Sequence, residues 1–208
     1  MARVNGGVES KISGMIGPVV FVNFNGGTYV RQAPRTRGKN SWSSDQVRSR
    51  KRFSEVCSFW RKSIPVSVKQ VWNLAAEKMN GFNLFLKINL PAFGADGTLA
   101  DMDRFHFSQG ILPLPHKLQV TRISGADDKI SVNWQNDSGN GFALPNDELV
   151  MITTAGMNFL DPIPTGATRK QETAVISLKG NLNPINGIFL YFKSKERNLY
   201  SIDQFFGI

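Results

Sequence analysis

The segment DMDRFH contains the residues of this sequence that come closest to a metal-binding pattern. Asp101, Asp103 and His106 place two carboxylates and an imidazole within six positions, and both kinds of group bind divalent cations. The sequence offers no fourth ligand nearby, and it contains two histidines in all. We therefore interpret DMDRFH as a polar linker, and we expect no metal and no other cofactor.

Nucleophilic catalysis and nucleotide binding find no better support in the sequence. Cys57 is the one cysteine, which excludes an intrachain disulfide, and it falls on the apolar face of an expected helix, where we expect a buried, unreactive thiol. His106 and His116 both lie in the expected connector region, so no Ser-His-Asp arrangement can be argued. The glycine pairs Gly6-Gly7 and Gly26-Gly27 do not open a helix after a strand, as a phosphate-binding loop does. We expect that the protein is not an enzyme.

The strongest chemical signal is a dense positive charge between Arg31 and Lys62. This stretch holds ten basic residues against two acidic ones, Asp45 and Glu55. Such density suits a phosphate backbone, since each neutralised phosphate releases condensed counterions, and the preference for Arg over Lys suits bidentate contacts with phosphate or carboxylate. We expect the contact residues for nucleic acid or a neighbouring subunit to be Arg31, Arg35, Arg37, Lys39, Trp42, Arg48, Arg50, Lys51, Arg52, Arg61 and Lys62.

The charge alone leaves the partner open. Nucleic acid, an acidic surface of another subunit and a solvated helix face without a partner all fit it. Trp42 lies in the expected linker and is the best candidate for stacking on a base. Phe53 and Trp60 share the apolar face of the expected helix, so we expect them in a core instead.

The N-terminal half predicts a hairpin and short helices. Residues 1–18 are rich in glycine and indicate an extended arm, and a hairpin is expected from Val19 to Gln32 because Asn25-Gly26 suits a tight turn. Helices are expected over 44–62 and from Ser67 to an end at Gly81, and the run after Phe82 favours a short third helix over a strand. Residues 94–110 are rich in glycine and aspartate and predict the boundary between two regions.

Beyond residue 117 the hydrophobic period changes from that of helices to that of strands. Alternation places Ile130, Val132 and Trp134 on one face of a strand. In the run IFLYF, Ile188, Leu190 and Phe192 share one face, and Phe189 and Tyr191 share the other. The runs expected as strands are KLQVTRI, KISVNWQ, ELVMITT, TAVISL, GIFLYFKS and NLYSIDQFF.

Two domains are therefore expected, with different charge. The chain has a net charge of +9, and the first hundred residues hold 15 basic and 5 acidic residues against 10 and 11 in the rest. We expect an α+β module over residues 1–103, made of a β-hairpin and two or three short helices. An all-β immunoglobulin-like sandwich is expected over residues 104–208. No apolar run is long enough for a membrane span or forms a signal peptide, so a cytoplasmic or virion location without a membrane partner is expected.

Two resemblances add to this interpretation. Residues 118–206 resemble a fibronectin type III or other immunoglobulin-like domain, with ISVNW as its second strand carrying Trp134 and GIFLYFKS as its sixth strand carrying Tyr191. The N-terminal half is similar in arrangement to uncharacterised bacterial and phage-associated proteins, through GMIGPVVF, GGTYVRQAP, RSRKRF, VKQVWNLAA and GFNLFLKIN. The second resemblance implies a particle-associated structural protein and supplies no catalytic residue.

The expected function is therefore structural. We predict a non-enzymatic component of a multi-subunit assembly, a phage or phage-like virion protein of capsid or tail, whose partners are its own copies or other particle subunits. Its basic N-terminal part would contact neighbouring subunits or packaged nucleic acid. The alternative is a soluble DNA-binding protein whose β-sandwich recruits a partner.

Overall fold

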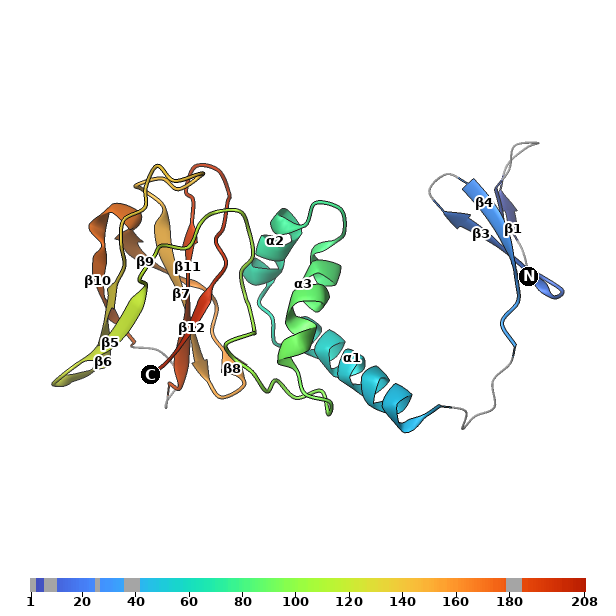
Figure 1. Ribbon diagram of the computed structural model, residues 1–208, viewed down its shortest axis with the longest axis horizontal. Helices are drawn as coiled ribbons and strands as arrows, with labels where there is room; N and C mark the ends of the chain where they lie inside the picture. Colours follow the sequence, from blue (N-terminus) through green and yellow to red (C-terminus); the bar gives the residue numbers. More distant parts are fainter. Residues whose placement is uncertain (1–2, 6–10, 25–26, 36–41, 179–184) are drawn as a thin grey trace. The chain divides into compact units, whose positions relative to one another are not determined.

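The computed structural model describes residues 3–5, 11–24, 27–35, 42–178 and 185–208, which form two compact units (Figure 1). The N-terminal unit is residues Met1–Ser43, and the second unit, here called the body, is Ser44–Ile208. The expected boundary near residue 103 differs from this division. The helices and one of the two sheets of the body share a hydrophobic core, so the helical segment does not separate from the strands that follow it.

The N-terminal unit is an antiparallel sheet in which β1 (Arg3–Asn5), β2 (Lys11–Ile16), β3 (Val19–Phe24) and β4 (Gly27–Gln32) are neighbours in chain order. The expected hairpin is confirmed as β3 and β4, whose register pairs Val19 with Gln32, while Asn25 and Gly26 lie outside the described residues. The expected extended arm is wrong for the described residues before it, because β1 and β2 add to the hairpin. Gly17, with a φ of +58°, permits the tight turn between β2 and β3.

The three helices of the body lie where they were expected, but some of their ends differ from the expected ones. They are α1 (Ser44–Lys62), α2 (Val66–Ala75) and α3 (Gly81–Asn89), followed by the 3₁₀ turn η1 (Leu90–Ala92). Gly81 begins α3 instead of ending α2. A Cβ at Gly81 would lie 2.6 Å from the backbone nitrogen of Asn73, so glycine lets α2 and α3 approach closely.

Two antiparallel sheets complete the body. In one sheet the order is β10-β6-β5, and in the other it is β12-β11-β7-β8, with β9 also paired to β7. Each of the six runs expected as strands contains an observed strand, although NLYSIDQFF forms β12 only in its second half, and β8 and β9 were not expected. The strands are β5 (Gln119–Ile123), β6 (Ala126–Asn133), β7 (Glu148–Ala155), β8 (Asn158–Phe159), β9 (Ile163–Thr168), β10 (Thr173–Ser177), β11 (Gly187–Lys193) and β12 (Gln204–Gly207).

The sheet containing β7 and β11 is buried on both faces. On β11, Ile188, Leu190 and Phe192 pack into a core shared with Ile130 and Val132 of β6. The alternation expected for IFLYF is thus confirmed. The opposite face of this sheet packs into a second core with residues of the helices, and its members include Val56, Val68, Trp72, Phe85, Phe105, Phe107, Val150, Ile152, Phe189 and Tyr191. The body is therefore layered, with helices, one sheet and then the other.

The segment expected as a linker belongs to the helical core. Phe105 and Phe107 are each 1% exposed. Asn89, at the end of α3, donates to the carbonyl of His106 at 3.0 Å and accepts from its backbone nitrogen at 2.7 Å. The expected linker is wrong because the alternating aromatics of RFHF bury themselves and the backbone between them is held on both sides. Among the described residues, no helix has the length and apolarity needed to cross a membrane.

Candidate functional site

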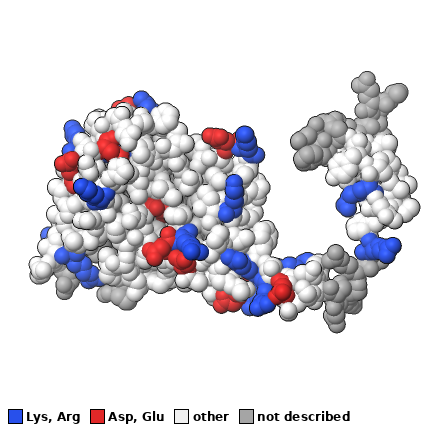
Figure 2. Space-filling view, in the orientation of Figure 1, with Lys and Arg blue, Asp and Glu red and all other residues white. Residues whose placement is uncertain are grey.

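Helix α1 presents most of the basic residues that the sequence suggested as a contact surface. It carries six basic and two acidic residues, and its buried residues are Val56 and Cys57. The contact with the core is made in the C-terminal half, so the first turns are exposed on every side. Lysine and arginine gather along this helix in the space-filling view (Figure 2). The C-terminal half of α1 therefore packs against the core of the body, and its N-terminal half is exposed and accessible to a partner.

Some of the expected contact residues already have partners within the body. Arg48 forms an exposed ion pair with Asp45, one turn earlier on α1. The guanidinium of Arg52 is half-buried and donates to the carbonyl of Leu90, at the end of α3. Arg52 therefore joins α1 to α3, and its charge is less available to a partner than that of a solvated arginine.

An open hollow lies along α1 between Arg50 and Arg61, with Phe53 and Cys57 in its lining. Phe53 is 50% exposed, so its expected place in the core is wrong, whereas Trp60 packs against the core as expected. Cys57 is buried, as expected for an unreactive thiol. An exposed aromatic ring beside two arginines can stack on a nucleobase or on an aromatic side chain of an acidic partner while the charges bind phosphate or carboxylate.

The remaining expected contact residues lie in several places. Lys51 and Lys62 are exposed on α1. Arg31 on β4, Arg35 after it and Trp42, which is 40% exposed, belong to the N-terminal unit. Arg37 and Lys39 lie outside the described residues. The structure brings Arg50 and Arg61 together on one helix face, and it does not place the N-terminal residues relative to them.

Asp101 and His106 of DMDRFH form hydrogen bonds with different partners. Asp101 accepts from the backbone nitrogen of Arg104 at 3.1 Å, while Nδ1 of His106 lies 2.9 Å from Oδ1 of Asp203. Asp203 is fully buried and also accepts from the backbone nitrogen of Phe107 at 2.8 Å. Burial lowers the pKa of His106, but the hydrogen bond and charge of Asp203 outweigh it and raise this pKa above its ordinary value. Among the described residues, no three acidic, histidine or cysteine side chains could hold a metal ion together.

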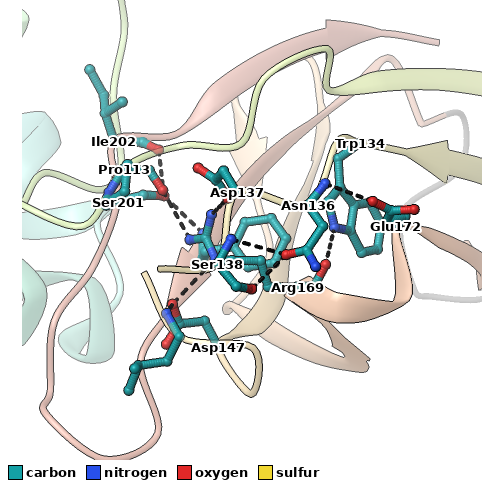
Figure 3. Close-up of polar contacts among 12 residues, drawn as sticks. Pro113, Trp134, Asn136, Asp137, Ser138, Asp147, Arg169, Glu172, Ser201 and Ile202 are labelled. Atoms are coloured by element: carbon teal, nitrogen blue, oxygen red, sulfur yellow. Dashed lines mark hydrogen bonds and ion pairs between the residues drawn. The ribbon is translucent and has the colours of Figure 1, made fainter. Parts of the chain in front are cut away.

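Sequence reasoning missed a buried ion cluster at one end of the sheets (Figure 3). Arg169 is 0% exposed and begins the 3₁₀ turn η2 (Arg169–Gln171). Its guanidinium pairs with Asp137 and, at 3.3 Å, with Asp147, and it donates to the carbonyl of Pro113 at 2.9 Å. The same cation lies 4.5 Å from the ring centroid of Phe192. The single guanidinium contacts both carboxylates, whose second oxygens (Oδ2 of Asp137 and Oδ1 of Asp147) are buried without a hydrogen-bond partner. These contacts join three loops of the body.

Trp134, expected as a core residue, closes the same end of the body. Its indole nitrogen donates to the carbonyl of Arg169 at 2.8 Å, and its ring lies 5.6 Å from that of Phe192. Tyr191 faces the helical core instead. This side matches the alternation expected for IFLYF, and Phe192 is the residue of β11 that packs against Trp134.

The N-terminal sheet forms a second surface that the sequence did not reveal. No described side chain of this unit is buried. Met15, Ile16, Tyr29 and Val30 are each between 50% and 56% exposed. In a four-residue stretch of β3, VVFV, every residue is apolar and only partly buried. A sheet with this composition is normally covered by another layer.

Comparison with known proteins gives one family. Residues 11–199 match the family described as "Family of unknown function (DUF6266)". No curated protein and no solved structure matches the chain.

Proposed function

This chain belongs to the family of unknown function DUF6266, and we propose that it is a non-enzymatic structural component of a multi-subunit assembly. In this proposal the body is the rigid part, and the N-terminal sheet and α1 make the contacts with neighbours. The observation that carries the proposal is the contrast in burial between the two units.

The body contains buried apolar cores, whereas none of the described side chains of the N-terminal sheet is buried. On β11, six successive residues from Gly187 to Phe192 are buried. On β3, none of the described side chains is buried, although Val19, Val20, Phe21 and Val22 are all apolar. Such a sheet gains its stability when a partner supplies the missing layer, since a lone sheet exposes too much apolar surface. This requirement supports a role inside an assembly.

The charge of α1 supports an anionic neighbour. Arg50, Lys51, Arg61 and Lys62 are exposed on this helix, and the hollow between Arg50 and Arg61 exposes Phe53. A nucleic acid or an acidic subunit surface supplies the matching charge. The resemblance of the N-terminal segments to phage-associated proteins supports a phage or phage-like particle as the assembly.

We further propose that the two sheets of the body form an immunoglobulin-like sandwich of the fibronectin type III kind. The pairing order β5-β6-β10 corresponds to the first, second and fifth strands of such a domain. The order β9-β7-β11-β12 corresponds to the others. The shared core of Ile130, Val132, Leu149 and Leu190 supports face-to-face packing of the two sheets. The helical layer on the outer face of β7 and β11 would then be an addition to that domain.

A DNA-binding role is the second candidate, and the exposed basic residues of α1 favour it. The experiment that separates the candidates measures binding of the full chain to labelled duplex and single-stranded oligonucleotides between about 50 and 200 mM salt. If nucleic acid is the anionic partner, the logarithm of the affinity falls linearly with the logarithm of the salt concentration. If the partner is an acidic subunit, no such binding occurs, and the protein still assembles with itself.

Matched variants make this test specific for α1. We expect Arg50→Ala with Arg61→Ala to reduce the salt slope by about 2 on duplex DNA, because each phosphate contact contributes about 0.9. The control is Arg122→Ala with Lys129→Ala, which removes two exposed charges from the body's other sheet. Equal losses from both double variants would contradict a site on α1 and indicate diffuse attraction to a positive protein.

A further inference from the structure

The register of the N-terminal sheet assigns its side chains to two faces. Directly paired residues of neighbouring strands share a face, and successive residues of one strand alternate. Phe21 pairs with Val30, and Ile16 pairs with Val19. Val22 pairs with Tyr29, and Val20 pairs with both Met15 and Arg31. We call the first face the Phe21 face, with Ile12, Gly14, Ile16, Val19, Phe21, Asn23, Thr28, Val30 and Gln32.

The two faces differ in charge. None of the residues assigned to the Phe21 face is charged, and its polar members, Asn23, Thr28 and Gln32, lie toward the ends of β3 and β4. The hydroxyl of Thr28 donates to the side-chain oxygen of Asn23 at 2.6 Å, so these two polar groups satisfy each other. On the opposite face the exposed Arg31 lies beside Val20. The Phe21 face can therefore be covered without burying a charge.

A second copy of this sheet is the partner that fits. An isologous pair places the same patch on both sides, so a partner must be apolar and uncharged wherever the first copy is. Copies meeting through the opposite face would bring two arginines together in an apolar contact, which is unfavourable. The Phe21 face carries no positive charge that a nucleic acid or an acidic subunit could bind.

In the part of the chain that the structure describes, neither sheet of the body presents a whole apolar face to solvent, although Ile163 and Val175 are exposed beside a hollow between β9 and β10. The sheet of β7 and β11 is covered on both faces. The outward residues of the other sheet are polar apart from Val175, and they include Lys129, Ser131, Asn133, Thr173 and Ser177. A second N-terminal sheet supplies an apolar, uncharged layer that matches the Phe21 face.

We propose that the Phe21 face docks on the same face of a second copy, so that two N-terminal sheets form a two-layer β-structure between subunits. This inference deepens the proposed function by naming the partner, but it does not depend on any anionic ligand. Strands of six residues spaced about 4.8 Å apart give a face of about 300–400 Å², which is below a standard interface of about 800 Å² per partner. The dimer is therefore weak in solution, and it strengthens where an assembly raises the local concentration.

Mass measurement of the full chain by sedimentation, from about 1 µM to about 1 mM, tests the docking. We expect a reversible monomer–dimer equilibrium that Val30→Lys weakens at least about 100-fold, since each interface carries the new charge twice. Tyr29→Lys is the matched control, because Tyr29 and Val30 are neighbours on β4 with 50% and 55% exposure and face opposite ways. Tyr29→Lys is expected to change the dissociation constant by less than about threefold.

Cysteine labelling gives a readout that does not need a charged substitution. Cys57 is replaced by alanine, and Val30→Cys or Tyr29→Cys supplies the single reactive thiol. As the protein concentration rises, reaction of Val30→Cys with a maleimide slows, and that of Tyr29→Cys does not. A monomer at every concentration, equal labelling of both thiols, or equal weakening by both lysines would overturn the proposal. If nucleic acid is the partner of α1, salt-dependent binding to DNA persists in each of those cases, so failure of the docking is distinguishable from failure of that proposed contact.

Discussion

Strands β3 and β11 have nearly the same apolar character and opposite surroundings. The residues VVFV of β3 are half-buried, whereas IFLYF of β11 is buried between the helices and the other sheet. A continuous apolar run is typical of a strand covered on both faces. In the body, the helices and the second sheet pack on the two faces of β11. Strand β3 has a similar apolar composition, but no layer of the described N-terminal unit buries its side chains. The comparison shows that the composition of a strand indicates how many of its faces should be buried. It does not identify the molecule that buries them.

The largest expected effect comes from Phe105, which joins the helical layer to the sheet. Its ring lies within 6.2 Å of the rings of six other phenylalanines, among them Phe59 of α1 and Phe189 of β11. Phe105→Ala is expected to lower the free energy of unfolding of the body by about 3–5 kcal/mol, measured by urea denaturation. Phe21→Ala in the N-terminal sheet is the control, and its effect on the same transition is expected to be below about 0.5 kcal/mol. Similar losses of unfolding free energy from both variants would contradict the distinction between the buried core of the body and the N-terminal sheet.

The buried ion cluster should be nearly as important. Arg169→Met leaves Asp137 and Asp147 without their cation, and we expect a loss of at least about 3 kcal/mol in the free energy of unfolding. Arg104→Met, which removes an exposed pair with Asp101, should cost less than about 1 kcal/mol. A small effect at Arg169 would show that water replaces the guanidinium at this end of the body.

The contact between His106 and Asp203 makes the body sensitive to pH. Because the folded pKa of His106 is raised above its unfolded value near 6.5, the pair stabilises the fold fully below that pH and loses its contribution as the pH rises through the folded pKa. The difference in thermal midpoint between the native chain and His106→Gln should therefore shrink between pH 6 and pH 8.5. His116→Gln changes an exposed histidine and serves as the control. A difference that grows with pH would contradict the assignment.

The smallest effect on stability is expected at the exposed charges of α1. Lys51→Ala should change the free energy of unfolding by less than about 0.5 kcal/mol, because the side chain is exposed. The same variant is expected to reduce the salt slope of duplex DNA binding by about 1 if nucleic acid is the partner. A large loss of stability would mean that Lys51 belongs to the fold and not to a contact surface.

Local patterns in the sequence predicted the positions of the helices and strands well. Helix α1 begins and ends where its apolar period and the break at Ile64-Pro65 predict, and the alternation in IFLYF separates the residues of the two cores as expected. These features depend on neighbours within a few residues, so the pattern contains the information.

Contacts between residues far apart in the sequence could not be predicted from these local patterns. DMDRFH reads as a linker because its glycine-rich and acidic surroundings hide Phe105 and Phe107, which are buried against strands more than 40 residues away. Arg169 resembles any turn residue until Asp137 and Asp147 are folded around it. For the candidate site, the charge of α1 was visible in the sequence, but the coupling of Arg52 to Leu90 and the exposure of Phe53 depend on how α1 meets α3.

Hydrogen–deuterium exchange of the full chain at two protein concentrations tests the contrast between the units most directly. Peptides covering residues 148–155 and 187–193 should be strongly protected at both concentrations, since β7 and β11 are covered within the body. Peptides covering residues 11–24 and 27–35 should exchange quickly in dilute protein and gain protection as the concentration rises. Protection of the N-terminal sheet that is equally strong at both concentrations would contradict the account, because the sheet would then be complete within one chain.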